Sequence, residues 1–159
     1  MSASPARAAD APITLVLKRI FDAPREKVFD AWIDPTQLAA WMGPRGVRAE
    51  LPVLEPRVGG SYRIVMHMES GQTPVVSGVY REIARPERLV FTWSWEGGHP
   101  GGIASHETLV TLTFRDVGGK TEMTMRHDGF ENEAARDSHT HGWNGSFDKL
   151  AETFTSATP

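Results

Sequence analysis

The sequence predicts an α+β fold in which a seven-stranded antiparallel sheet wraps around a long C-terminal helix. Between residues 47 and 128, apolar side chains alternate along six short segments, and Gly- and Pro-rich turns separate these segments at fairly regular spacing. Near the C-terminus the period changes, because aromatic residues recur there at helical spacing. A helix that follows a series of strands has a sheet to pack on. We therefore expect an apolar cavity between the sheet and this helix.

A strand and two short helices precede these six segments. Residues 13–21 alternate with one apolar face and form the first strand. Pro24 suits the first turn of a helix, and apolar residues at helical spacing follow it as far as Ile33. The second helix begins at Asp34, because an N-cap Asp, a Pro at the first helical position and a Gln at the third form a capping-box pattern. Gly43 and Pro44 then end this helix.

The six later segments are interpreted as strands of one antiparallel sheet. They lie near residues 47–54, 60–68, 75–84, 88–96, 106–116 and 120–128. Their alternation gathers aromatic and Met side chains on single faces, as in Tyr62, Ile64 and Met66. Such faces are too apolar for contact with water, so we expect them to turn toward the helix.

The long helix begins at Glu131 or Asn132 and ends near Thr155. Its apolar stripe consists of Trp143, Phe147, Leu150 and Phe154. Gly142 and Gly145 lie inside it, although each costs about 1 kcal/mol relative to Ala in a helix. We expect these small residues to let the helix approach the sheet closely.

Size and composition favour one domain with a balanced charge. We interpret the 159 residues as a flexible N-terminal tail over residues 1–12 and a single domain over residues 13–156. The 17 basic and 20 acidic residues give a net charge of −3, which argues against nucleic-acid binding. Neither a secretory signal nor a run of about 18 apolar residues occurs, so we expect a cytoplasmic protein without a membrane partner. The absence of cysteine excludes disulfides, thiolate metal sites and cysteine nucleophiles.

The six histidines do not form a metal-binding pattern. His139 and His141 would lie about 200° apart around a helix. His67, His99 and His106 lie on or beside loops of separate segments. Nucleotide-binding glycine motifs and the Gly-x-Ser-x-Gly elbow are also absent. We therefore expect neither a metal ion nor a cofactor.

Short motifs along the chain carry a resemblance to a known family. They are Phe21-Asp22-Ala23-Pro24, Val28-Phe29-Asp30-Ala31-Trp32, Asp34-Pro35, Leu38, Trp41-Met42-Gly43-Pro44, Gly59-Gly60, Gly78, Pro86-Glu87-Arg88-Leu89-Val90-Phe91-Thr92-Trp93, Val110-Thr111-Leu112-Thr113-Phe114, Gly129-Phe130 and Gly142-Trp143. Their order resembles the START-like (SRPBCC) superfamily, in particular bacterial relatives of the C-terminal domain of the activator of the heat-shock-protein-90 ATPase. The order of the predicted elements is likewise that of the helix-grip fold.

The resemblance implies a sheet that grips the terminal helix around an apolar pocket. Relatives use this pocket for lipids, sterols, polyketides and other hydrophobic compounds, and some relatives are cyclases or aromatase-like enzymes. The chaperone-activating role is not carried over. In the co-chaperone members a separate N-terminal domain supplies much of the chaperone contact, and we expect 159 residues to leave no room for it.

The predicted ligand pocket consists of inward-facing aromatic, aliphatic, Met and His side chains. They are Trp32, Tyr62, Ile64, Met66, Tyr80, Phe91, Trp93, Trp95, Met123, Met125, His127, His139, Trp143 and Phe147. For most of the aromatic residues the alternative is ordinary core packing, and for His127 and His139 it is a hydrogen-bonded polar group at the cavity rim. The Gly-rich loop over residues 96–103 is either a lid over the opening or an ordinary hairpin loop.

Three functions fit these features. The first is binding of a small hydrophobic or aromatic molecule by a monomer or homodimer. The second is a cyclase- or hydratase-like enzyme, in which His127 or His139 is the base and Tyr62 or Tyr80 donates to a developing oxyanion. The third is a chaperone-interacting stress-response module, which predicts an exposed apolar patch and a closed interior.

Overall fold

The computed structural model of the chain describes residues 13–97 and 107–155. The elements in chain order are β1 (Ile13–Phe21), α2 (Arg25–Ile33), α3 (Pro35–Trp41), β2 (Arg48–Leu54), β3 (Ser61–His67), β4 (Val75–Ala84), β5 (Arg88–Glu96), β6 (Thr108–Val117), β7 (Lys120–Phe130) and α4 (Glu133–Thr155). The strands form one antiparallel sheet in the order β1-β7-β6-β5-β4-β3-β2. The predicted seven-stranded sheet, the two short helices and the long C-terminal helix are thus confirmed.

Two predictions concern parts of the chain that lie outside the described residues. The first is the N-terminal tail over residues 1–12. The second is the suggested lid, of which residues 98–103 fall outside, and His99 and His106 do so as well. Within the described residues, no helix has the length and apolar character needed to cross a membrane.

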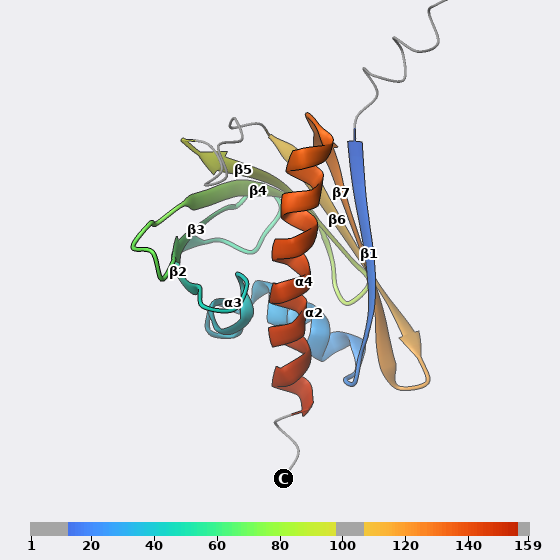
Figure 1. The fold of residues 1–159 in the computed structure, drawn as a ribbon. Coiled ribbons are helices and arrows are strands. Elements are labelled where there is room, and N and C mark those ends of the chain that lie inside the picture. Colours follow the sequence, from blue (N-terminus) through green and yellow to red (C-terminus); the bar gives the residue numbers. More distant parts are fainter. Residues whose placement is uncertain (1–12, 98–106, 156–159) are drawn as a thin grey trace, which may run out of the picture.

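The sheet is curved, and α4 runs across its hollow side (Figure 1). The curvature has a local cause, because the register shifts between Tyr80 and Glu82 in the β4–β5 pair and between Glu50 and Val53 in the β2–β3 pair. Such bulges bend and twist a strand. The helix packs against β1, β7 and α3, while β2 to β4 curve away from it.

The core between α4 and the sheet is dominated by aromatic rings. Trp32 of α2 lies at its centre, with ring centroids 4.6 Å from Trp41, 5.8 Å from Trp143 and 6.0 Å from Phe147. Trp143, Phe147 and Leu150 are buried, and Phe154 packs edge-on against Phe21 of β1 at 5.9 Å. The aromatic stripe of the long helix therefore faces the sheet, as predicted.

A charged residue on the inward face of β1 also forms an ion pair with α4. Arg19 interrupts the apolar alternation of this strand, and its guanidinium donates to the Asp148 carboxylate of α4 at 2.7 Å. The pair lies at the edge of the interface, where Asp148 is about half exposed. Arg19 therefore completes the inward face of β1 without a buried, unpaired charge.

A glycine in β4 lets the Tyr62 side chain of β3 pass over β4 and reach β5. Gly78 lies opposite Tyr62 of β3, whose hydroxyl donates to the backbone oxygen of Thr92 in β5. A Cβ atom at residue 78 would lie 2.0 Å from that oxygen and 2.7 Å from the Tyr62 ring. Gly is therefore required at this position, because any side chain would occupy the space of the tyrosine.

Candidate functional site

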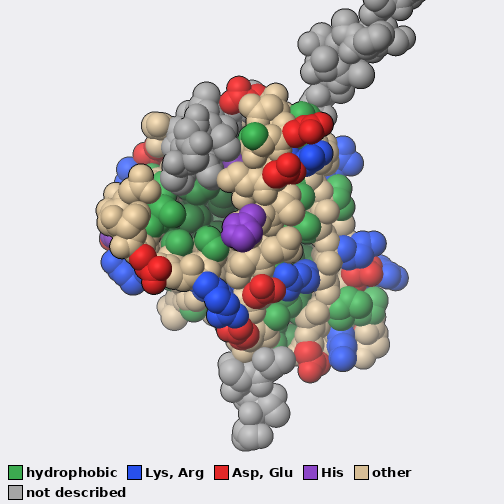
Figure 2. All heavy atoms as spheres, viewed as in Figure 1, with side chains coloured by type: hydrophobic (Ala, Val, Ile, Leu, Met, Phe, Trp, Pro, Cys, Tyr) green, Lys and Arg blue, Asp and Glu red, His purple; other side chains and the backbone are tan. Residues whose placement is uncertain are grey.

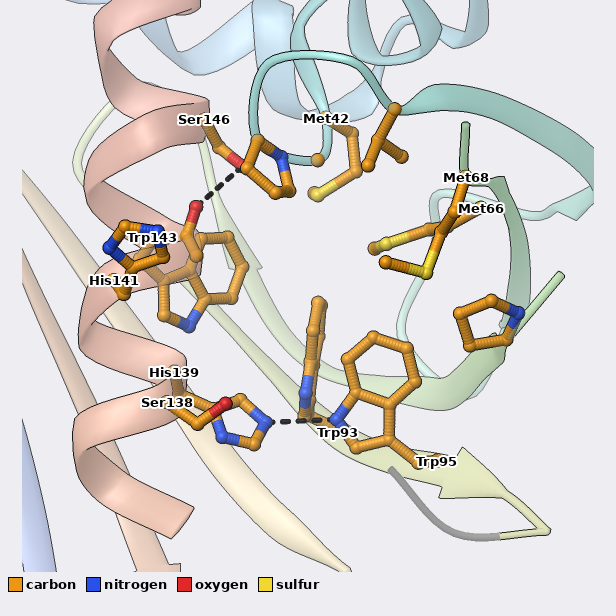
Figure 3. Close-up of a pocket in the computed structure, with 15 residues that line it drawn as sticks. Met42, Met66, Met68, Trp93, Trp95, Ser138, His139, His141, Trp143 and Ser146 are labelled. Carbon is orange, nitrogen blue, oxygen red and sulfur yellow. Dashed lines mark hydrogen bonds between the residues drawn. The ribbon is translucent and has the colours of Figure 1, made fainter. Parts of the chain in front are cut away.

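A cavity of about 180 Å³ lies between the curved sheet and α4 (Figure 3). Its wall comes from α4, from β5, from the end of β3 with the following turn, and from the connection between α3 and β2. The lining residues are Met42, Gly43, Pro44, Val47, Met66, Met68, Pro74, Trp93, Trp95, Ser138, His139, His141, Gly142, Trp143 and Ser146. Figure 2 shows this region as a hollow with hydrophobic side chains beside α4.

Methionine and tryptophan side chains dominate the wall. Met42, Met66 and Met68 point into the space from one side, and three indole rings face them from the other (Figure 3). Thioethers are flexible and polarisable and make favourable contacts with aromatic rings, whereas indoles offer flat, rigid surfaces. The combination suits a flat apolar guest whose outline can vary.

Apart from the indole N–H groups of Trp93 and Trp95, the polar side chains of the cavity lining come from α4. His141 is exposed at the rim, and Ser138 is half-buried one turn before it. The Ser146 hydroxyl donates to the backbone oxygen of Gly142 at 3.1 Å and is satisfied within its own helix. The wall is thus almost entirely apolar inside, with hydrogen-bonding groups near the surface.

His139 holds one tryptophan of the wall in place. The Trp95 Nε1–H donates to His139 Nε2 at 2.9 Å, and His139 Nδ1 lies 2.8 Å from the backbone oxygen of Ala135. A carbonyl accepts and an indole N–H donates, so Nδ1 carries the proton and the ring is neutral. Burial lowers the pKa of His139, although the hydrogen bond to Ala135 opposes this effect.

His127 holds a second tryptophan in the same way. The Trp143 Nε1–H donates to His127 Nδ1 at 3.1 Å, and His127 Nε2 lies 2.7 Å from the Thr108 hydroxyl, which donates to the backbone oxygen of Trp93. Nε2 therefore carries the proton of a neutral ring. Burial lowers the pKa of His127 well below its ordinary value, and the nearby His139 adds to this effect. The two histidines are opposite tautomers that fix the indoles of β5 and α4.

Comparison with known proteins identifies the family. A family model described as "Activator of Hsp90 ATPase homolog 1-like protein" matches residues 22–155. The chain belongs to this family. The predicted resemblance is therefore confirmed, and the family lies within the START-like superfamily, whose members typically bind hydrophobic ligands.

Solved structures of bacterial proteins share the fold. A protein from Chromobacterium violaceum is 27% identical with a TM-score of 0.80, and the match covers 89% of this chain and 96% of that one. A protein from Silicibacter pomeroyi that is named AHSA1 is 26% identical with a TM-score of 0.77, covering 90% and 98%. A protein from Rhodobacter sphaeroides is 27% identical with a TM-score of 0.75, covering 92% and 95%. A search of curated proteins found no match.

The predicted pocket residues fall into three groups in this AHSA1-like chain. Those that line the cavity are Met66, Trp93, Trp95, His139 and Trp143. A separate void of about 10 Å³ is lined by Trp32, Leu38, Met42, Tyr62, Ile64, Tyr80, Phe91 and Trp93. The remaining predicted residues, Met123, Met125, His127 and Phe147, are fully buried in the core and belong to neither lining.

The predicted pairing of a histidine base with a tyrosine donor is not assembled around one space. The cavity lining includes His139 but neither tyrosine, and the lining of the void includes Tyr62 and Tyr80 but no histidine. Burial raises the pKa of both tyrosines, and the Tyr62 hydroxyl is already bonded to Thr92. Both nitrogens of each buried histidine are also engaged. The geometry therefore gives the cyclase-like hypothesis no support.

The glycines of α4 have a different role from the one predicted. A Cβ atom at Gly145 would lie 2.9 Å from the Pro44 Cβ, so the close approach is to the α3–β2 connection and not to the sheet. Gly142 has open space in the Cβ direction and is itself part of the cavity wall. Sequence periodicity did not predict that the α3–β2 connection lines the cavity, because periodicity indicates helices and strands and gives no information on the position of loops.

No group of three or more His, Cys, Asp or Glu residues is arranged to hold a metal ion within residues 13–97 and 107–155. His139 is buried and His141 exposed, so their side chains diverge as the predicted helical spacing requires. His67 instead lies 2.8 Å from the Glu50 carboxylate of the neighbouring strand.

Proposed function

We propose that this AHSA1-like chain binds a small, largely apolar molecule, about the size of one substituted aromatic ring, in the cavity between the sheet and α4. The observation that carries the proposal is a space of about 180 Å³ walled by three Met and three Trp side chains. An apolar cavity of about 150 Å³ is large enough for benzene. Flat indole walls favour a flat guest.

The expected affinity is modest. A guest that buries about 200 Å² of apolar surface gains roughly 5 kcal/mol at 25 cal/mol per Å², before the cost of association is subtracted. Few polar groups face the interior, so contact area dominates the binding energy. We expect binding to tolerate changes in ligand shape, since the three Met side chains can adjust.

The test is a titration with α-methylstyrene, an uncharged aromatic probe, followed by the indole N–H signals in ¹H–¹⁵N NMR spectra. The chain has five tryptophans, and three of them line the cavity. We expect saturable changes in the signals of Trp93, Trp95 and Trp143 and a smaller change for Trp41, which lines neither the cavity nor the void. Unchanged signals up to the solubility limit of the probe would contradict the proposal.

Gly142→Leu is the matching variant. Its side chain would enter the open space beside Gly142 and occupy part of the cavity, so we expect saturable binding to be lost. The fold should persist, because Leu raises helix propensity by about 0.8 kcal/mol relative to Gly. Ala134→Leu adds a larger apolar side chain at an exposed position of the same helix and should bind like the wild type. Unchanged binding by a folded Gly142→Leu variant would place the site elsewhere.

A further inference from the structure

Two of the five tryptophans bury a hydrogen-bond donor that has no partner among the described residues. The Trp32 and Trp93 indole nitrogens are buried, and neither bonds to any of the residues that the structure describes. The other three indoles are all satisfied: Trp41 donates to Ala31 oxygen at 2.9 Å, Trp95 to His139 and Trp143 to His127. A buried donor without a partner costs free energy, and a native protein that keeps one requires an explanation.

Both unpartnered indoles border the same small void. Trp32 and Trp93 lie among the residues that line the space of about 10 Å³ under α3, together with Tyr80 and Phe91. The two rings are themselves 2% and 4% exposed. Both residues that carry these donors thus line one apolar space, and no described residue accepts from either N–H.

The void adjoins the cavity. Met42 and Trp93 line both spaces, so these two side chains form the partition between them. Met42 enters from the α3–β2 connection and points toward the cavity (Figure 3). A Met side chain has three rotatable bonds, so Met42 is the more adaptable of the two shared residues.

Charge restricts what the void can accept. Its lining consists of Trp, Leu, Met, Tyr, Ile and Phe side chains, and no cationic residue is among them. A carboxylate in such surroundings would lose its hydration without gaining an opposite charge. A neutral oxygen acceptor, such as a ketone carbonyl, needs hydrogen-bond donors and nothing more.

We propose that the void is the inner end of the binding cavity and that Trp32 and Trp93 donate there to a neutral oxygen acceptor of an aromatic ligand. The aromatic body would occupy the space between the Met and Trp walls, and its carbonyl would pass Met42. The ligand class is therefore an aryl ketone or a similarly uncharged, oxygen-bearing aromatic compound. The inference rests on the proposed function, since it assigns the polarity of a ligand in the same cavity.

Acetophenone and α-methylstyrene are matched probes for this proposal. They have nearly the same shape, but acetophenone has a carbonyl oxygen where α-methylstyrene has a methylene group. In the wild type we expect both to bind. Acetophenone should move the Trp32 and Trp93 indole proton signals downfield relative to their positions with α-methylstyrene, as a new N–H···O bond requires. This comparison needs no variant, and it stands even if a Trp substitution fails to fold.

Substitution then isolates each donor. Trp32→Phe and Trp93→Phe remove the N–H and keep an aromatic ring. Each substitution should reduce the affinity for acetophenone about three- to tenfold more than the affinity for α-methylstyrene. Packing losses affect both probes alike and cancel in this ratio. Trp41→Phe is the control, because its N–H already bonds to Ala31 and it lines neither space; the ratio should stay at the wild-type value.

The outcomes separate this inference from the proposed function. If neither probe binds, the cavity is not a binding site and both proposals fail. If both bind, but the Trp32 and Trp93 signals respond equally to the two probes and the affinity ratio is unchanged in both Phe variants, the acceptor assignment alone is overturned.

Discussion

Two neutral histidines determine how individual side chains of the cavity wall are held. His127 and His139 each accept a hydrogen bond from an indole N–H, and their ring centroids are 5.4 Å apart. A protonated imidazole has no acceptor, so protonation of either ring breaks its bond to tryptophan and places a charge in an apolar core. The arrangement therefore stabilises the fold while both rings are neutral.

This pairing predicts acid sensitivity in a defined pH range. In the unfolded chain a histidine titrates near pH 6.5, whereas burial lowers the pKa of both groups in the folded state. Below about pH 6.5 the unfolded chain therefore binds more protons, and the free energy of unfolding should fall as the pH falls. The slope is at most about 1.4 kcal/mol per pH unit for each histidine. Urea unfolding between pH 7.5 and 5 measures it.

His139→Gln is the control for that slope. The Gln amide oxygen can still accept from Trp95, but this side chain does not titrate. Between about pH 6.5 and 5 the variant should lose roughly half of the pH dependence, whatever its stability at pH 7.5. Identical slopes in the two proteins would show that His139 does not contribute.

For single residues, the sequence predicts which face of the sheet a side chain lies on, but not whether that side chain lines the cavity or packs in the core. The alternation places Met66 and Met125 on inward faces of their strands, and both side chains are buried. Met66 lines the cavity, whereas Met125 is fully buried outside it. The difference depends on how far each strand lies from α4, which follows from the curvature of the whole sheet and leaves no trace in a period of two.

Among the elements, α4 shows how two similar residues can have opposite roles. Gly142 and Gly145 lie three positions apart, but the Cβ direction is open at the first and blocked by Pro44 at the second. The sequence predicts the helix and its buried stripe from a period of 3.6 residues. It does not predict the contact with the α3–β2 connection, because a loop has no period from which its position could be inferred.

Alanine at these two positions should have opposite effects on stability. Gly142→Ala replaces a poor helix former at a position where no described atom outside its own helix backbone and chain neighbours lies within 4 Å of the added Cβ. We expect a gain of about 1 kcal/mol in the free energy of unfolding. In Gly145→Ala, overpacking against the rigid Pro44 ring outweighs the gain in helix propensity. We therefore expect the free energy of unfolding to fall by about 1 kcal/mol. Urea unfolding of the two variants tests this, and a stabilised Gly145→Ala would contradict the packing described here.

For the molecule as a whole, the cavity results from a mismatch between a curved sheet and a straight helix. The helix packs on β1 and β7, and the bulged strands β2 to β4 bend away from it. The topology was predictable because strand periodicity, turn residues and family motifs agreed. The division into a cavity, a void and a solid core was not, since it is the sum of many long-range contacts.

Ligand binding should therefore stabilise the entire fold. The cavity exists in the folded state, so a guest binds the folded chain and not the unfolded one. At a free probe concentration of about 100 times Kd, we expect the free energy of unfolding to rise by about 2.7 kcal/mol. Thermal unfolding at increasing α-methylstyrene concentration measures this gain. The gain should be absent in Gly142→Leu, and an equal gain there would indicate binding outside the cavity.

The open space beside Gly142 has a consequence for how ligand size is set. Gly142 belongs to the cavity wall, and outside its own helix backbone and chain neighbours no described atom lies within 4 Å of the Cβ that another residue would place there. A series from Gly through Ala and Val to Leu at this position would shorten the accessible space in steps, while the rest of the wall stays the same. The largest guest that each variant binds would then show how much of the native cavity each added carbon atom removes.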